Sequence, residues 1–204
     1  MEDYYTPTMI QQTIPEADMT PLERLLLSHI FESERDEEGW YFYSESGPAD
    51  MIMVERAALE SALAASELDV DSTTNGFVRE LLADLRDEKV QNGYLDIDLS
   101  ITSWEFIVQD VVRRSSTLKY VSAVSSFTCS RIRPDGFGGA VVVISADAIL
   151  SKSTSDSRNS SSRSRPRAIA APIARRAKPR SLPASPEDRP ASPLRRTRLP
   201  PHAR

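Results

Sequence analysis

Residues 120–150 read YVSAVSSFTCSRIRPDGFGGAVVVISADAIL and hold the most apolar strand pattern in the chain. From Val121 to Cys129, apolar side chains alternate with Ser and Thr, a period typical of a half-buried strand. The sequence RPDG at 133–136 favours a tight turn, because proline fixes its backbone angle and glycine accepts a positive φ. The run AVVVI at 140–144 is apolar throughout, as in a strand covered on both faces. We therefore predict a β-hairpin.

A helix is expected directly after this hairpin. Ser145 and Asp147 are both plausible N-caps for a helix that starts with Ala148-Ile149-Leu150.

The N-terminal residues divide into a leader and a first helix. Residues 1–19 have no sustained period and are expected to be a flexible leader. The sequence TPLE at 20–23 predicts a helix start, with a Thr cap, Pro at the first helical position and Glu completing a capping box. His29 falls on the apolar stripe of this helix and is interpreted as a core or boundary histidine. The acidic run at 32–38 is expected to end the helix.

The middle of the chain mixes helical and strand patterns. Strands are predicted at 40–43 and 94–99, and helices at 56–65, 77–85 and 104–112. Periodicity does not decide whether residues 51–54 are a strand or the first turn of a helix. We predict a single α+β domain over residues 20–152, with a small mixed or antiparallel sheet, a C-terminal β-hairpin and several packed helices.

Charge separates the chain into two parts. Residues 1–150 carry 27 Asp and Glu against 11 Lys and Arg, a formal charge of −16, whereas residues 151–204 carry +11. A single cysteine excludes an internal disulfide framework and fits a reducing compartment. The N-terminus is acidic and polar, unlike a signal peptide, and no apolar run approaches the roughly 20 residues that span a bilayer. A cytoplasmic location without membrane contact is expected.

Residues 153–204 form a basic segment rich in Arg, Pro and Ser. They contain no aromatic residue and nine of the 14 prolines, so we expect this tail to be disordered. Three explanations stay open: an arm that binds nucleic acid, a segment switched by phosphorylation, and an out-of-frame end translated from GC-rich DNA. The out-of-frame explanation fits the abrupt change of composition, which falls where the predicted helix should form its second turn. Nucleic acid is expected to bind only through this tail.

The hairpin turn provides the candidate binding site. Arg131 and Arg133 lie beside Asp135 and Gly136, and they are two of only 11 basic residues in an acidic body. They can form an anion or carboxylate site. The alternative is that they solvate the hairpin tip or pair with local acids.

Other candidate chemistry has a simpler structural explanation. Asp96 and Asp98 are two residues apart on a predicted strand, hence on one face, where they can hold a metal or simply form a solvated surface. Cys129 is interpreted as a small buried hydrophobe without a neighbouring base. We assign no catalytic residue, metal or cofactor.

One resemblance follows from the hairpin. The runs FTCSRIRPDGFGG at 127–139 and VVISADAI at 142–149 resemble the C-terminal part of uncharacterised proteins of rhizobia and other alphaproteobacteria, often carried on plasmids. The resemblance covers about residues 20–150 and implies a bacterial, cytoplasmic accessory protein. Our first hypothesis is a non-enzymatic protein that binds another protein. The alternatives are a nucleic-acid-associated protein that uses the tail and an enzyme or anion-binding module with a site at residues 131–135.

Overall fold

The computed structural model describes residues 4–67, 72–85, 93–100, 102–129, 136–154 and 167–168. Compactness divides the chain into Met1–Pro172 and Ile173–Arg204, and every described residue belongs to the first unit. This unit has an α+β fold, in agreement with the prediction from the sequence. The predicted disordered tail lies outside the described residues, apart from residues 153–154 and 167–168.

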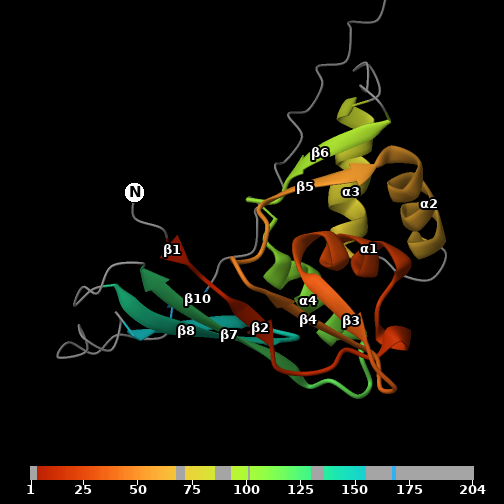
Figure 1. Cartoon of the computed structure of the whole chain (residues 1–204). Coiled ribbons are helices and arrows are strands. Elements are labelled where there is room, and N and C mark those ends of the chain that lie inside the picture. The colour runs from red at the N-terminus through yellow and green to blue at the C-terminus, as the bar shows by residue number, and fades with distance from the viewer. Residues whose placement is uncertain are drawn as a thin grey trace, which may run out of the picture. The chain divides into compact units, whose positions relative to one another are not determined.

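An antiparallel sheet forms one layer of the domain (Figure 1). Its strands are β1 (Tyr4–Tyr5), β2 (Thr8–Ile10), β3 (Glu32–Arg35), β4 (Trp40–Ser44), β7 (Tyr120–Cys129), β8 (Phe137–Ser145), β9 (Ile149–Ser153) and β10 (Arg167–Ala168). The order is β10-β9-β8-β7-β2-β4-β3, and β1 also pairs with β7. The predicted β7–β8 hairpin is confirmed, with Val121, Ala123 and Cys129 on its buried side.

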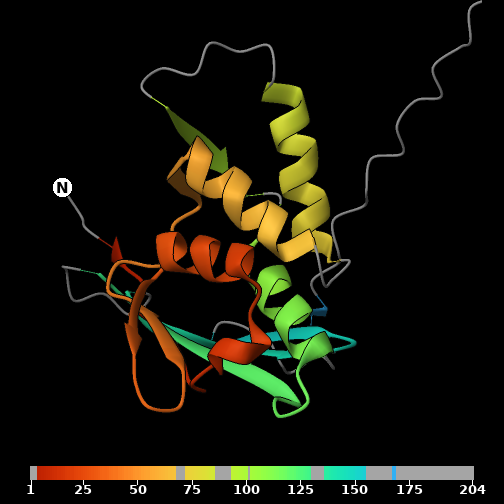
Figure 2. The ribbon, with the colours of Figure 1, turned by 90° about the vertical axis from the view of Figure 1, so that its right-hand side faces the viewer.

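Helices cover one face of this sheet. They are α1 (Pro21–Ile30), α2 (Arg56–Glu67), α3 (Thr73–Asp84) and α4 (Trp104–Arg114), and the short 3-10 helix η1 (Glu16–Asp18) precedes α1. Helices α1 and α4 lie next to the sheet, and α2 and α3 pack on them (Figure 2). The capping box of Thr20 and Glu23 at the start of α1 is confirmed. None of the described helices has the length and apolar composition needed to cross a bilayer.

A second, two-stranded sheet stands across the helices from the large one. Its strands are β5 (Met51–Glu55) and β6 (Tyr94–Asp98), which pair antiparallel (Figures 1 and 2). Their inward side chains Ile52, Val54, Leu95 and Ile97 are buried in the core. The undecided residues 51–54 therefore form a strand, because pairing with β6 provides the hydrogen bonds and the core receives every second side chain.

The interpretation of residues 1–19 as a flexible leader is wrong for residues 8–19. Strand β2 pairs with β7 on one side and with β4 on the other, and Ile10 and Ile14 are 2% and 0% exposed. A three-residue strand is too short to show a period in the sequence, so only the pairing reveals it.

Two further segments form strands that were not predicted. Helix α1 ends at Ile30, directly before the acidic run, as expected. Residues 32–35 of that run form the edge strand β3, which is stable because β4 pairs with it while its charged side chains stay in solvent. The helix expected from Ala148 is absent, and β9 forms instead. Ser145 Oγ accepts a hydrogen bond from Ala148 N at 3.2 Å, which caps a turn between β8 and β9 rather than a helix.

The described helices cover the large sheet on one face only. Its strand β8 was expected to be buried on both sides, but Val141 and Val143 are 42% and 37% exposed on the side away from the helices. His29 is also exposed rather than part of the core. Helical spacing places His29 near the apolar stripe, yet only the packing partners determine how wide that stripe is.

Candidate interaction surface

The predicted hairpin site lies largely outside the described residues. This applies to Arg131, Arg133 and Asp135. Gly136 is described and buried, and its carbonyl accepts a hydrogen bond from Cys129 N at 2.9 Å. The role of Gly136 in the described structure is therefore to continue the β7–β8 pairing.

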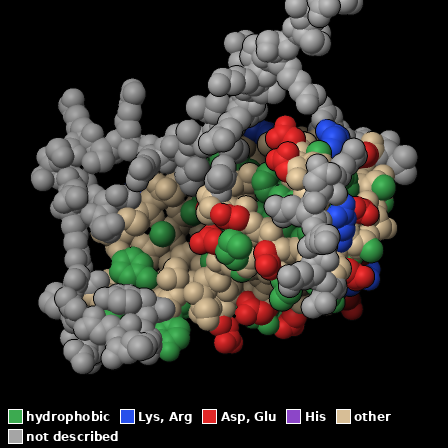
Figure 3. Space-filling view, turned by 90° about the horizontal axis from the view of Figure 1, so that it is seen from above, with side chains coloured by type: hydrophobic (Ala, Val, Ile, Leu, Met, Phe, Trp, Pro, Cys, Tyr) green, Lys and Arg blue, Asp and Glu red, His purple; other side chains and the backbone are tan. Residues whose placement is uncertain are grey.

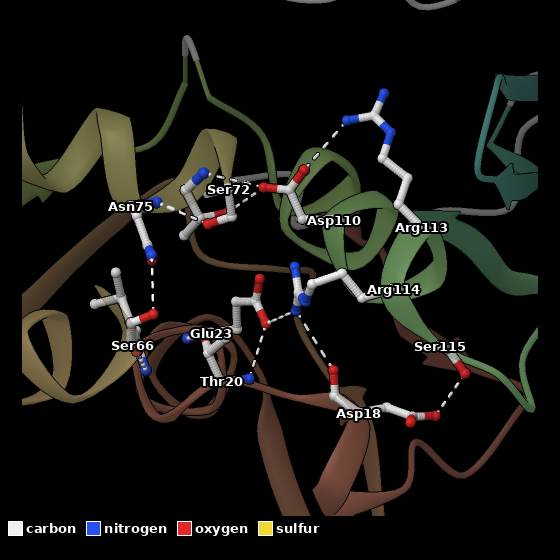
Figure 4. A network of polar contacts seen from close by, with 12 residues as sticks. Asp18, Thr20, Glu23, Ser66, Ser72, Asn75, Asp110, Arg113, Arg114 and Ser115 are labelled. Atoms are coloured by element: carbon white, nitrogen blue, oxygen red, sulfur yellow. Dashed lines mark hydrogen bonds and ion pairs between the residues drawn. The ribbon is translucent and has the colours of Figure 1, made fainter. Parts of the chain in front are cut away.

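A buried carboxylate, Glu23, joins α1 to α4 (Figure 4). Its side chain is 0% exposed, and Oε2 accepts hydrogen bonds from Thr20 N at 2.9 Å and from Arg114 Nη2 at 2.5 Å. Burial raises the pKa of Glu23, although Thr20 and Arg114 act in the opposite direction. A carboxyl with a raised pKa is a common mark of an active site. Here the carboxylate is enclosed between α1 and α4 and paired with Thr20 and Arg114, so we interpret it as structural.

Asp110 forms a second polar junction, between α4 and the start of α3 (Figure 4). Oδ2 accepts hydrogen bonds from Thr74 N at 3.0 Å and Thr74 Oγ1 at 3.1 Å, and Oδ1 accepts one from Arg113 at 3.2 Å. Asp110 thus satisfies one backbone donor at the N-terminus of α3, where a negative charge is favoured. Sequence reasoning missed this junction because its members lie 36 residues apart.

Two hollows of the described surface each lack an acid and a base placed together for catalysis. One, of about 360 Å³, lies between α1 and α2 beside Trp40, and its charged member Arg24 is paired with Glu16. Another, of about 330 Å³, lies over β7, β8 and β9 with Lys152 at its side. Within the described ranges, no group of three His, Cys, Asp or Glu side chains is arranged to hold a metal ion.

The outward face of the β5–β6 sheet combines large apolar and acidic side chains. We call it the methionine–acid ribbon; it consists of Met51, Met53 and Glu55 on β5 and Tyr94, Asp96 and Asp98 on β6. Met51 lies opposite Asp98, and Met53 lies opposite Asp96. Figure 3, which views the domain from above, shows hydrophobic and acidic side chains next to one another on that side of the molecule.

The apolar members of the ribbon are unusually open to solvent. Met51, Met53 and Tyr94 are 59%, 63% and 52% exposed, so each can lose much apolar surface to a partner. The side chains below them are buried, which makes the ribbon a supported platform rather than a loop. The prediction that Asp96 and Asp98 share one face is confirmed. The methionines were missed, since residues 51–54 had not been assigned to a strand.

Asp98 provides a stable negative charge on the ribbon. Hydrogen bonds from the hydroxyl and the backbone N–H of Ser100 lower the pKa of this carboxyl. It therefore stays ionised at neutral pH.

Comparison with protein-family models, with curated proteins and with solved structures finds no match. The arrangement of side chains on this domain is thus the basis for a functional proposal.

Proposed function

We propose that this protein is a binding module that captures a basic, amphipathic segment of another protein on the methionine–acid ribbon. The observation that carries the proposal is the exposure of Met51 and Met53 opposite two carboxylates. Methionine side chains are flexible and polarizable, and they are common at surfaces that accept varied apolar partners. The role of an accessory protein in a bacterial cytoplasm, expected from the resemblance, is part of this proposal.

The two strands of the ribbon favour different sides of the same partner. Strand β5 offers Met51 and Met53, whereas β6 offers Asp96 and Asp98. A helix lying along the ribbon fits best if it turns an apolar stripe toward β5 and Lys or Arg side chains toward β6. The neighbouring cation Arg56 does not oppose this, because it is paired with Glu60 at 2.8 Å.

The test uses the full chain and a fluorescent helical peptide in which Leu and Lys form separate faces. We expect binding that weakens in salt. Replacing Asp96 and Asp98 together by Asn should weaken it about tenfold, and replacing Met51 and Met53 together by Ser should do the same by removing apolar contact. Fluorescence anisotropy titrations measure both effects.

Two controls make the result specific. Glu37→Gln with Glu38→Gln removes the same charge from an exposed loop outside the ribbon and should leave the affinity within about twofold. A peptide of the same composition without separate faces should bind poorly. Equal binding by the ribbon variants and the wild-type chain would refute the proposal.

A further inference from the structure

The face of the large sheet that points away from the helices carries a second exposed apolar surface. We call it the aliphatic face; it consists of Met9, Val124, Val141, Val143 and Leu150, which are between 37% and 48% exposed. Strand register makes it continuous, since Met9 lies beside Val124, Val124 beside Val141, and Val143 beside Leu150. Exposed aliphatic side chains grouped in this way mark an interaction surface more often than scattered ones do.

Charge distribution limits what can cover this face. On β2, β7, β8 and β9, its outward positions carry one charged side chain, Lys152, whereas residues 1–150 as a whole carry a formal charge of −16. Residues 1–150 of two copies repel each other over most of their surfaces, although residues 151–204 reduce the net charge of the whole chain to −5. The aliphatic face itself carries no carboxylate, so two copies can approach there with little loss of carboxylate hydration.

A single row of residues across the sheet is self-complementary. From one edge to the other it reads Lys152, Val141, Val124, Met9, Tyr43 and Glu32, each the register partner of the next. The row therefore begins with a cation, continues through apolar side chains and ends with an anion. A two-fold axis parallel to the strands reverses this row in the facing copy, so that each Lys152 lies over Glu32 of the other copy.

We propose that two copies of this chain pair face to face through the aliphatic face, around a two-fold axis parallel to the strands. Such packing of one sheet on another joins the cores of many β-sandwiches. The methionine–acid ribbon lies across the helices from this face, so pairing leaves it open (Figure 2). The inference does not depend on the function proposed for the ribbon.

The experiment measures the mass of the full chain across the micromolar range, by light scattering after size exclusion and by sedimentation equilibrium. We expect twice the chain mass of 22.7 kDa. Val141→Asp should weaken self-association at least about 100-fold, since it removes a carboxylate from water against Tyr43 of the other copy, with no cation opposite it. If Val141→Asp lowers the melting temperature strongly, Val141→Thr serves instead, because it keeps the β-branched shape and should still weaken pairing.

A charge exchange tests the axis. Lys152→Glu should weaken pairing about tenfold, and adding Glu32→Lys should restore it, because the two opposed pairs form again with reversed sign. Met53→Asp on the ribbon is the matched control and should leave the mass unchanged. A monomeric wild-type chain overturns the proposal, as does a dimer insensitive to both Val141 variants. Failure of the exchange to restore pairing overturns the axis.

Discussion

Glu23 illustrates how one residue can have a local and a distant role in the same structure. Its carboxylate closes the capping box at the start of α1, a role visible in the sequence. The same oxygen also accepts a hydrogen bond from Arg114, 91 residues further along the chain. Because the Glu23 side chain is fully enclosed, its carboxylate has lost its hydration. The ion pair with Arg114 offsets this desolvation cost and adds little net stability.

The raised pKa of Glu23 predicts a particular pH dependence of stability. In the folded state the carboxyl binds a proton more tightly than in the unfolded state, where its ordinary value is 4.5. The free energy of unfolding contributed by Glu23 therefore falls as the pH rises from that value through the folded pKa. Glu23→Gln cannot ionise, so the wild-type chain should lose stability relative to this variant between about pH 4 and about pH 7.

Urea denaturation of both proteins at the two pH values measures this difference, and other titrating groups cancel in the comparison. A wild-type advantage that grows with pH would contradict the prediction. It would mean that the Arg114 charge outweighs burial.

Two glycines should respond in opposite directions to alanine. At Gly39 an added Cβ would lie 2.3 Å from the backbone oxygen of Ile14, within the bridge that Ile14 and Trp40 form. Gly39→Ala should lower the free energy of unfolding by at least about 2 kcal/mol. Gly76 lies in α3 with nothing near its Cβ position, so Gly76→Ala should raise stability by up to about 1 kcal/mol. Thermal and urea denaturation measure the change in stability for both variants. Equal effects of the two substitutions would contradict the different surroundings described for Gly39 and Gly76.

At the scale of elements, β2 is the strand on which the sheet depends. It joins the β7–β8–β9 part to the β4–β3 part, although it has only three residues. The short strand gains its stability from two neighbours and from the burial of Ile10.

Substitution within and beside β2 tests this role. Ile10→Ala should destabilise the domain by about 2–4 kcal/mol, the usual cost of a cavity in a packed core. Gln11→Ala, one residue further, changes an exposed side chain and should alter stability by no more than about 0.5 kcal/mol. Urea denaturation of both variants distinguishes an integral strand from a loose leader. Similarly small losses of stability in both variants would favour a flexible leader over an integral strand.

The whole molecule combines two apolar surfaces with different electrical surroundings. The ribbon has carboxylates among its apolar side chains, while the aliphatic face is nearly uncharged. Binding to the ribbon should therefore weaken steeply with salt, whereas pairing through the aliphatic face should be nearly insensitive to it, apart from its two Lys152–Glu32 contacts. If both proposals hold, a dimer offers two ribbons and gains avidity for a partner with repeated basic segments.

The sequence by itself determined the helices, the β7–β8 hairpin and the α+β class. These features depend on local signals: the capping box at Thr20, the alternation from Val121 to Cys129, and helical spacing within single segments. They are readable because neighbouring residues provide most of the interactions that define them. The shared face of Asp96 and Asp98 was predictable for the same reason, since a strand alternates regardless of its surroundings.

Only the tertiary structure decided three of the strands and the exposed surfaces. Strands β2, β3 and β9 exist because a neighbour provides hydrogen bonds, and no local pattern records that neighbour. Likewise, Val141 and Val143 look like core residues in the sequence, but the helices cover the other face of β8. Burial is a property of what packs against a side chain, so the apolar surfaces proposed here for binding and pairing became visible only once the layers were in place.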